Sequence, residues 1–517
     1  MLKNHHAGDR TAAPPASLRL LPRATWEAEL REVEKRLLAN PNSADLYFRR
    51  AFCLSELGRR AEARQEYIKV LEREPHHLGA LNNLGSELVL TGQRQAARIA
   101  YQEAVLRHPG DPMSRVNLGH FLLEESERMT VKQLLQEALQ LKQEARGHFE
   151  HALQAAPEYE KAHEGLSYVL ADLGEPEQAE QHRHEAFQKR AVMPIPYRGK
   201  ATPVLALLLV STTGGNVRLQ KFLDEQIFQT YVVLPEFYDR NTPLPAHQLV
   251  INAIGDTEVS SAALAAAQAV LGLTKAPVIN PPAAVLATGR TENAARLACI
   301  PGVVTPLTVI LPREQLAAAD AAATLARSGF TFPLLLRAPG FHTGLNFLRV
   351  DNVDALPAAL AEIPGPELIV MQYLDARGAD GKSRKYRVMM IDGELYPLHV
   401  AISGNWKIHY FTAEMAENPE HRAEDAAFLE NMPAVLGPLA MNALRQIQPV
   451  LGLDYGGIDF GLNAQGEVLV FEANATMVVN APDPEERWQY RRPAYDRIQT
   501  AIQQMLLKRA GSVPLSA

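Results

Sequence analysis

Three oxygen-bearing side chains near the C-terminus have the types and spacing of a cation site. Apolar strands are predicted at 457–461 and 468–476, with Asp459 on the first and Glu472 and Asn474 on the second. Side chains alternate along a strand, so Glu472 and Asn474 share a face, and Asp459 can face them across the hairpin. Such hard oxygen ligands suit Mg²⁺ beside phosphates. A solvent-exposed hairpin is the alternative, which the apolar strands and the cost of an unpaired buried carboxylate disfavour.

The elements upstream of this hairpin alternate between strands and helices. Strands are predicted at 204–210, 249–254 and 277–280 and a helix at 260–271, an alternation typical of a small parallel sheet. The turn after the first strand reads Ser-Thr-Thr-Gly-Gly-Asn. It can offer backbone N–H groups to an anion, although it does not complete a dinucleotide fingerprint. The alternative to anion binding is that this region is only structural or substrate-facing.

Longer elements follow from about residue 283. The sequence predicts helices at 284–298 and 313–327 and strands at 307–311, 332–337, 346–350, 367–373, 386–391 and 394–402. Arg337 ends an apolar strand, and the loop Ala-Pro-Gly-Phe-His-Thr-Gly follows it at 338–344. Asp392 and Gly393 join the last two strands with the residue types of a type I′ turn.

The first third of the chain repeats itself with a step of 34 residues, which is marked by Pro41, Pro75 and Pro109. Small, aromatic and leucine residues fill this frame in two successive copies, at Tyr47, Ala51, Leu54, Ala63 and Tyr67, then at Gly85, Leu88, Ala97, Tyr101 and Ala104. The pattern resembles the tetratricopeptide repeat. Small residues let paired helices approach, aromatic rings fill the gaps, and proline ends the second helix of each pair.

A third copy carries 14 additional residues, about four helical turns, which keeps its packing face in phase. We therefore expect lengthened helices over 124–146 rather than a loop. A fourth copy runs through Leu166 and Ala186, and a half-copy around Trp26 caps the stack. Stacked repeats form a concave surface, which predicts a protein or peptide partner. A scaffold that only positions the second half is the alternative.

The second half of the chain, roughly 200–510, resembles the ATP-grasp superfamily, and most closely its glutathione-synthase and ribosomal-protein-glutamate-ligase branch. The resemblance rests on the order of elements, on the acid followed by Glu-x-Asn on the next strand, and on the segment QYLDARGADGKSRKYRVMMIDGELYP. It implies an α/β domain ahead of an α+β ATP-grasp fold. It also implies ATP and two Mg²⁺ ions, or Mn²⁺ in their place, with Asp459, Glu472 and Asn474 as metal ligands.

The same resemblance implies roles for further residues. The implied nucleotide-binding set is Arg290, Arg337, Gly340, His342, Gly344, Met371, Gln372, Tyr373, Leu374, Lys407 and His409. Backbone groups near 371–374 would hold the adenine, and the loop that contains Gly340 would fold over the triphosphate. The implied catalytic residues are Arg337 and Arg387. Arg387 would contact the phosphates or an acyl phosphate.

The chain departs from the family at several of these positions. Arg290 and Arg337 stand where the family usually has lysine, and a guanidinium keeps the charge while offering two donors to a phosphate. Lys385 stands where many relatives have an acid. Solvated surface charge is the alternative for both arginines, and an ordinary strand position is the alternative for His409.

The implied activity is ATP-dependent ligation of a carboxylate to an amine, through an acyl phosphate and with release of ADP. Charge stabilisation and positioning supply the rate of such a reaction, so it needs no nucleophilic side chain. The alternatives are a kinase-like enzyme that stops at a phosphorylated small molecule, and a non-catalytic nucleotide-binding scaffold that binds proteins through its repeats.

Composition narrows the classes of protein and partner. The 517 residues carry a formal net charge of −7, which argues against nucleic acid or a membrane as partner. Two cysteines and the lack of an apolar leader predict a cytoplasmic protein without a disulfide framework. The predicted organisation is a flexible N-terminus at 1–24, an all-α tetratricopeptide solenoid at 25–190, a linker at 191–202, an α/β domain at 203–283, an ATP-grasp domain at 284–510 and a flexible tail at 511–517.

Overall fold

The structure is a computed structural model that describes residues 22–131, 134–340, 344–408 and 413–511. The chain forms two compact units. Unit 1 contains the chain up to Thr212 together with residues 223–247, and unit 2 contains residues 213–222 and the chain from Gln248 onward. Within the described ranges, no helix combines the length and the apolar character that crossing a lipid bilayer requires.

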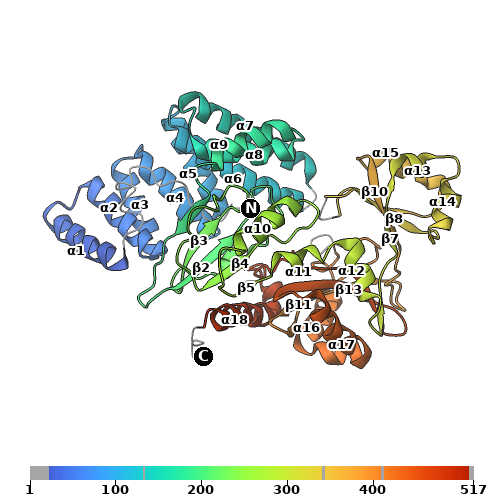
Figure 1. Ribbon diagram of the computed structural model, residues 1–517. Helices are drawn as coiled ribbons and strands as arrows, with labels where there is room; N and C mark the ends of the chain where they lie inside the picture. The colour runs from blue at the N-terminus through green and yellow to red at the C-terminus, as the bar shows by residue number, and fades with distance from the viewer. Residues whose placement is uncertain (1–21, 132–133, 341–343, 409–412, 512–517) are drawn as a thin grey trace. The chain divides into compact units, whose positions relative to one another are not determined.

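Unit 1 begins with helices that pack in successive pairs, coloured from blue to green in Figure 1. They are α1 (Arg23–Ala39), α2 (Ala44–Glu56), α3 (Arg60–Arg73), α4 (Leu78–Leu90), α5 (Arg94–Arg107), α6 (Pro112–Val131), α7 (Leu135–Ala155), α8 (Glu160–Asp172) and α9 (Pro176–Phe187). Pro41, Pro75 and Pro109 each lie two residues beyond a helix end, where a residue without an N–H cannot continue the helix. Ser43 caps α2 by accepting a hydrogen bond from the Leu46 N–H group.

Glycine allows the close packing inside these pairs. A Cβ atom at Gly85 in α4 would lie 2.6 Å from the buried ring of Tyr101 in α5, and one at Gly119 in α6 would lie 2.7 Å from the buried ring of Phe149 in α7. The helices α6 and α7 have 20 and 21 residues, against 13 and 14 in the preceding pair. The predicted repeat pattern and the predicted lengthening of the third copy are both confirmed.

Three strands complete unit 1, namely β1 (Val192–Ile195), β2 (Val204–Leu209) and β3 (Phe228–Val233). Strand β2 pairs in parallel with β3, and β1 pairs antiparallel with β3. The continuous apolar run at 204–210 predicted β2. Strand β3 was not predicted, because its sequence FQTYVV mixes polar and apolar residues. The segment predicted as a linker contains β1.

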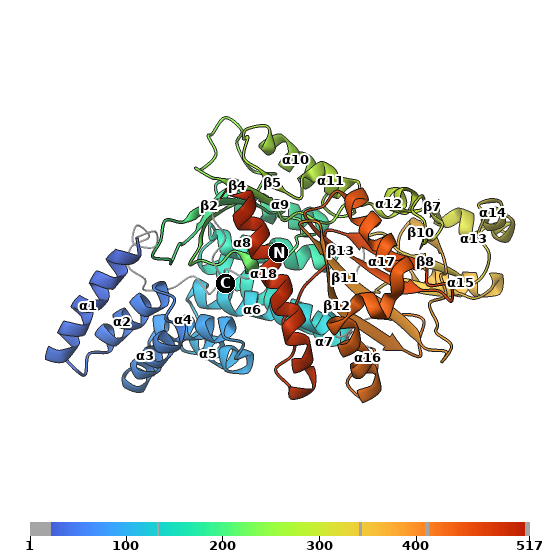
Figure 2. The same ribbon diagram turned by 90° about the horizontal axis from the view of Figure 1, so that it is seen from below.

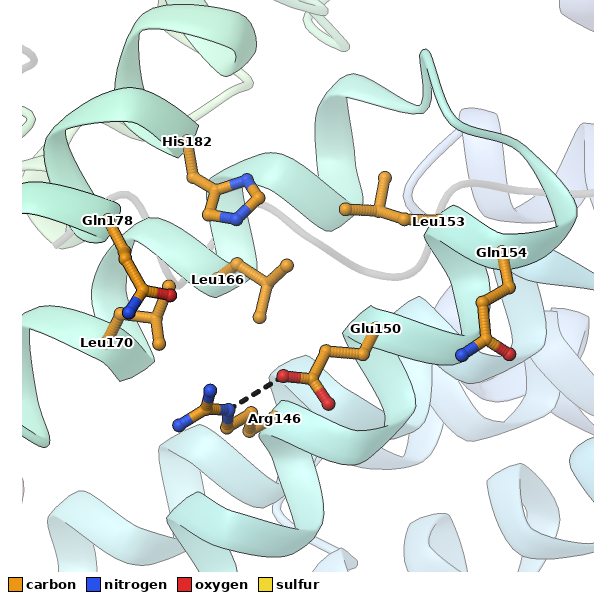
Figure 3. A pocket seen from close by; sticks show the side chains of 8 residues that line it. All are labelled: Arg146, Glu150, Leu153, Gln154, Leu166, Leu170, Gln178 and His182. Atoms are coloured by element: carbon orange, nitrogen blue, oxygen red, sulfur yellow. Dashed lines mark hydrogen bonds and ion pairs between the residues drawn. The ribbon is translucent and has the colours of Figure 1, made fainter. Parts of the chain in front are cut away.

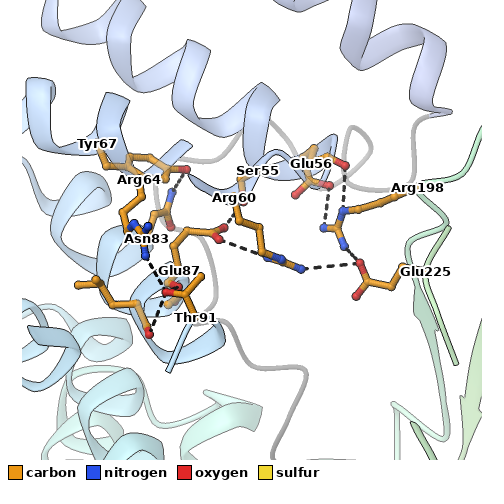
Figure 4. A network of polar contacts seen from close by, with 12 residues as sticks. Ser55, Glu56, Arg60, Arg64, Tyr67, Asn83, Glu87, Thr91, Arg198 and Glu225 are labelled. Atoms are coloured by element: carbon orange, nitrogen blue, oxygen red, sulfur yellow. Dashed lines mark hydrogen bonds and ion pairs between the residues drawn. The ribbon is translucent and has the colours of Figure 1, made fainter. Parts of the chain in front are cut away.

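A partly buried ionic network connects the segments beside these strands to the repeats (Figure 4). Arg198, two residues beyond the Pro196 that follows β1, donates from Nε to the Glu56 carbonyl at 2.8 Å and forms ion pairs with the carboxylates of Glu56 and Glu225. Arg60 of α3 lies 3.8 Å from the Glu225 carboxylate. The polypeptide between α9 and β2 is therefore held against α2 and against the residues that precede β3.

The first elements of unit 2 are β4 (Leu249–Asn252), α10 (Ser261–Leu271) and β5 (Val278–Ile279), and the two strands pair in parallel. All three were predicted within about two residues. The helix predicted over 284–298 is wrong, because α11 (Pro282–Leu286) and α12 (Arg290–Leu297) replace it. Gly289 adopts φ −52° and ψ 145°, which interrupts the helix and makes Arg290 the first residue of α12.

A four-stranded antiparallel sheet follows in the order β7-β10-β8-β9. Its strands are β7 (Thr308–Pro312), β8 (Leu334–Arg337), β9 (Phe347–Val350) and β10 (Glu367–Gln372). Three short helices share its apolar core, namely α13 (Arg313–Ala317), α14 (Ala321–Arg327) and α15 (Leu356–Glu362). The single helix predicted over 313–327 is wrong, because Ala318 is extended, with ψ 153°, and separates α13 from α14. Arg337 ends β8 as predicted.

The larger sheet of unit 2 has the order β12-β11-β13-β14-β6. Its strands are β6 (Val303–Val304), β11 (Ser383–Ile391), β12 (Glu394–Ser403), β13 (Tyr455–Leu462) and β14 (Val468–Asn474). Asp392 and Gly393 have positive φ values, 47° and 94°, as a type I′ turn requires. Figure 2 shows the helices beside this sheet, α16 (Pro419–Glu430), α17 (Met432–Leu451) and α18 (Arg492–Arg509). The predicted fold class, helical repeats followed by α/β and α+β regions, is confirmed.

Candidate active site

A row of polar side chains crosses four neighbouring strands of the larger sheet. His399 of β12 is paired with Arg387 of β11, Arg387 with Asp459 of β13, and Asp459 with Glu472 of β14. Side chains of directly paired residues lie on the same face of a sheet. Asn474 lies two residues beyond Glu472, so it shares that face. The structure therefore brings the predicted metal ligands and Arg387 together.

Asp459 is buried at the centre of this row and contacts two cations. Arg387 donates from Nε and Nη2 to the two carboxylate oxygens at 2.5 and 2.7 Å, and Lys385 Nζ lies 3.2 Å from Oδ2. Burial acts to raise the pKa of Asp459, but the charges of Arg387 and Lys385 outweigh it and hold that pKa well below its usual range. Asp459 is therefore ionised.

Glu472 and Asn474 are oriented by hydrogen bonds. Asn474 Nδ2 and Arg290 Nη2 both donate to Glu472 Oε1 at 3.0 Å. Asn474 Oδ1 accepts from the N–H and the hydroxyl of Thr476 at 2.9 and 2.8 Å. The end of β14 is thus connected to the start of α12 through a single carboxylate.

Arg290 is held between two acids. Its Nε donates to Glu258 Oε1 at 2.7 Å, while its Nη2 contacts Glu472. The other Glu258 oxygen accepts from the Gly340 N–H at 2.8 Å, in the turn after β8. Burial disfavours the charged guanidinium, but the two carboxylates outweigh it, so the pKa of Arg290 is raised. Glu258 escaped the sequence analysis because its partners are 32 and 82 residues away.

Arg337 is buried near the same acids and is 8% exposed. Burial, and then the charge of Arg290, lower the pKa of Arg337, whereas Glu472 and Glu258 act to raise it. The positive charges of Arg290 and Arg337 repel each other, and the nearby carboxylates attract Arg337. A polyanion such as a phosphate chain can bind both guanidinium groups at once.

An aromatic cluster lies where β10 ends. The ring of Trp406 meets those of Phe347 and Tyr373 edge-on, with centroids 5.5 and 6.3 Å apart, and the three rings pack beside the buried Met371. Such rings offer a flat apolar surface that can stack on a heterocyclic base. Sequence reasoning predicted Met371 and Tyr373 here but did not identify Phe347 or Trp406.

The remaining predicted positions are only partly described. Gln372 ends the β10 ladder and donates its N–H to the Leu307 carbonyl at 2.8 Å, and Leu374 follows outside the strand. Lys407 Nζ donates to the Phe347 carbonyl at 3.1 Å, and burial lowers the pKa of Lys407. A Cβ atom at Gly344 would lie 2.9 Å from Lys407 Cε. The predicted residues His342 and His409 lie outside the described residues.

His399 is a further residue of the candidate site that sequence reasoning missed. It is buried, and burial followed by the charge of Arg387 holds the pKa of His399 well below its ordinary range, so the imidazole is neutral. Its pairing with Arg387 depends on the irregular register after that residue, where β11 slips against β12. A register irregularity of this kind has no signal in the sequence.

The predicted ligands suit a divalent cation in type and placement. Asp459, Glu472 and Asn474 supply carboxylate and amide oxygens from adjacent strands, which is the donor type that Mg²⁺ prefers. In the structure, arginine and lysine groups hold the carboxylates. A divalent cation would therefore displace the arginine and lysine groups from these carboxylates, because the acids already have cationic partners in the protein. In the described residues, including this site, no group of three or more histidine, cysteine or acidic side chains is arranged to hold a metal, and the proposed set has two acids and one amide.

Unit 1 has a pocket of its own, of about 310 Å³, between α7, α8 and α9 (Figure 3). Its lining residues are Arg146, Glu150, Leu153, Gln154, Leu166, Leu170, Gln178 and His182. Arg146 and Glu150 form an ion pair of 2.7 Å at the edge. Leucines beside polar groups suit an amphipathic side chain, such as one from a peptide. No residue of the predicted nucleotide site lines this pocket.

Comparison with known proteins supports the helical repeat directly. A family model for the tetratricopeptide repeat matches residues 44–77, which span α2 and α3. The chain therefore contains a tetratricopeptide repeat at the predicted place. Among solved structures, MamA (residues 41 to end) from Desulfovibrio magneticus RS-1 is 20% identical, with a TM-score of 0.27. That match covers 33% of this chain and 89% of MamA.

Two further solved structures match a larger share of the chain. The VanG D-Ala:D-Ser ligase from Enterococcus faecalis is 16% identical, with a TM-score of 0.36, and the match covers 60% of this chain and 99% of that protein. The RimK domain protein ATP-grasp from Sphaerobacter thermophilus DSM 20745 is 17% identical, with a TM-score of 0.37 and coverage of 59% and 100%. No curated protein sequence matches this chain significantly.

Proposed function

We propose that unit 2 is an ATP-dependent carboxylate–amine ligase of the ATP-grasp type that releases ADP. The observation that carries this proposal is the ionised Asp459 beside Glu472 and Asn474, with guanidinium groups from β8, β11 and α12 around them. Oxygen donors for divalent cations and cationic donors for phosphates occur together there. That combination is what phosphoryl transfer from a nucleotide requires.

The nucleotide is proposed to use both parts of the site. Its adenine would lie against the cluster of Phe347, Tyr373 and Trp406, near the backbone of residues 371–374. Its phosphates would contact Arg290 and Arg337, together with backbone N–H groups of the turn after β8. The support for this placement is the flat aromatic surface on one side and the concentration of guanidinium groups on the other.

Asp459, Glu472 and Asn474 would hold the magnesium ions. Bound Mg²⁺ supplies neutralisation of the triphosphate and polarisation of the transferred phosphoryl group. The side chains of the protein do the remaining work. Arg387 would exchange its contact with Asp459 for the substrate's developing negative charge, and the buried Arg337 would orient the phosphates.

The proposed reaction has two steps. A substrate carboxylate oxygen bonds to the γ-phosphorus while the bond from that phosphorus to the bridging oxygen breaks, which gives an acyl phosphate and ADP. The nitrogen of an uncharged amine then bonds to the acyl carbon, phosphate leaves with the bonding electrons, and the nitrogen loses its extra proton to solvent. Arg337 and Arg387 stabilise the negative charge at both steps, so no nucleophilic side chain takes part.

Mass spectrometry tests this proposal. The protein is incubated with ATP, Mg²⁺ and cell extract, and the products are searched for ATP-dependent condensation products. We expect ADP release that requires both an acid and an amine and that matches amide formation. A stable phosphorylated product without an amide would favour the kinase-like alternative. Nucleotide binding without any ADP release would favour the non-catalytic scaffold.

We also propose that the repeats bind a peptide or protein, which supplies or recruits the substrate of unit 2. The tetratricopeptide match and the amphipathic pocket between α7, α8 and α9 support this role. Gln178→Arg would add a cation to that pocket from an exposed position on α9. If a peptide is identified as substrate, this variant should weaken its binding in calorimetry. An affinity equal to that of the unmodified protein would contradict a role for the pocket.

A further inference from the structure

Glu258 makes the contacts in unit 2 that a phosphate group would make. We propose that Glu258 is an internal anion that occupies part of the phosphate site and must leave it when a nucleotide binds. This inference rests on the proposed nucleotide-binding function, and it adds a residue to the site that neither the family resemblance nor the predicted metal set contains.

The two donors that Glu258 engages are the kinds that bind phosphate. One is the guanidinium Nε of Arg290, 2.7 Å from Glu258 Oε1, and the other is the backbone N–H of Gly340, 2.8 Å from Oε2. Guanidinium groups and glycine N–H groups in turns are common phosphate donors, because they present N–H bonds without steric obstruction. A single carboxylate with one oxygen on each donor reproduces the way in which two phosphate oxygens would bridge them.

The turn that carries Glu258 is held in place, so this contact is built into the fold. The buried Asp256 accepts from the N–H groups of Glu258 and Val259 at 2.8 and 3.2 Å. Ser260 Oγ donates to the Gly214 carbonyl at 3.0 Å. The Gly215 carbonyl accepts from the N–H groups of residues 255 and 256 at 2.9 and 3.1 Å. The turn that contains Gly214 and Gly215 therefore supports the turn that carries Glu258.

Electrostatics then determines the effect of Glu258 on binding. Arg290 already faces Glu472, so Glu258 adds a second negative charge at the position where phosphate oxygens are proposed to bind. An incoming polyanion must displace that carboxylate and is also repelled by it. Glu258 should therefore weaken binding of phosphate groups but leave binding of the base unaffected.

The test is a calorimetric comparison of Glu258→Gln with the unmodified full-length chain. Gln keeps the size and one acceptor but removes the charge. The ligands are ADP without metal, and adenosine, which has no phosphate. Glu314→Gln is the matched control, because it makes the same charge change at an exposed position on α13. We expect metal-free ADP to bind Glu258→Gln about three- to tenfold more tightly. Adenosine should bind all three proteins equally, and Glu314→Gln should bind ADP as the unmodified protein does.

Other outcomes overturn the inference in distinguishable ways. If ADP binds the unmodified protein but binds Glu258→Gln equally or more weakly, Glu258 only positions Arg290 and the internal-anion role is wrong. An equal gain in Glu314→Gln would assign the effect to net charge and would also refute it. If neither ADP nor adenosine binds any of the proteins, the proposed nucleotide site fails and this inference fails with it. Glu258→Ala, with circular dichroism to verify folding, repeats the measurement without the remaining acceptor.

Discussion

Asp459 and Glu472 face each other across one hairpin, yet the protein holds them differently. The side chain of Asp459 is 4% exposed and is fixed by Arg387 and Lys385, whereas that of Glu472 is 29% exposed and contacts Arg290 and Asn474. Removing one charge from a buried pair leaves its partner buried without compensation, which costs more than the same change near the surface. The two acids should therefore behave differently as variants.

Glu472→Gln should lower ADP release at least about a hundredfold, because a proposed metal ligand loses its charge, but should leave thermal stability nearly unchanged. Asp459→Asn should abolish ADP release as well, and it should also lower the free energy of unfolding by about 3 kcal/mol. Glu467→Gln, in the turn of the same hairpin, is the matched control and should retain activity. Steady-state kinetics and urea unfolding measure the two effects. Full turnover in both site variants would refute the metal assignment.

At the scale of elements, the sequence pattern predicted correctly those strands and turns that depend on only a few neighbouring residues. The apolar run of β2, the Asp392-Gly393 turn and the Glu-x-Asn strand all formed as expected, because alternation and turn chemistry act within a few residues. The predicted helix over 284–298 breaks at Gly289, a residue type that often ends helices, whereas the helix over 313–327 breaks at Ala318 in alanine-rich sequence without a glycine or proline. Sequence reasoning missed Glu258 and His399 because their partners lie on other elements. The sequence alone does not show which elements lie side by side in the folded chain.

The packing of the repeat helices gives a prediction at this scale. Gly85→Ala should lower the free energy of unfolding by about 1–3 kcal/mol, because the new methyl group would lie within 2.6 Å of the Tyr101 ring. Gly147→Ala in α7 meets no atom within 4 Å and should instead raise stability by up to about 1 kcal/mol, the ordinary helix gain of alanine over glycine. Urea unfolding followed by circular dichroism compares the two. Equal effects would mean that Gly85 is not needed for close packing.

At the scale of the whole molecule, the compact units do not coincide with the order of domains along the chain. Strands β1, β2 and β3 belong to unit 1 with the repeats. The α/β domain at 203–283 that the resemblance implied stays a prediction. Within unit 1, Arg198 joins the segment after β1 to Glu56 of α2 and to Glu225, which precedes β3. Proline content does not distinguish a linker from this segment, because proline is found in turns and edge strands as well as in linkers.

Arg198→Ala tests this organisation. Arg198 and the Glu56 side chain are both 6% exposed, and loss of Arg198 would remove the cation beside the buried Glu56 carboxylate, so we expect unit 1 to lose about 3–5 kcal/mol of stability. Hydrogen–deuterium exchange of the full chain should become faster in α2 and β3, while β13 and β14 of unit 2 keep their protection. Arg240→Ala, at an exposed position in unit 1, is the matched control and should change neither. Unchanged exchange in α2 would show that the repeats and the strands of unit 1 are stabilised independently of this network.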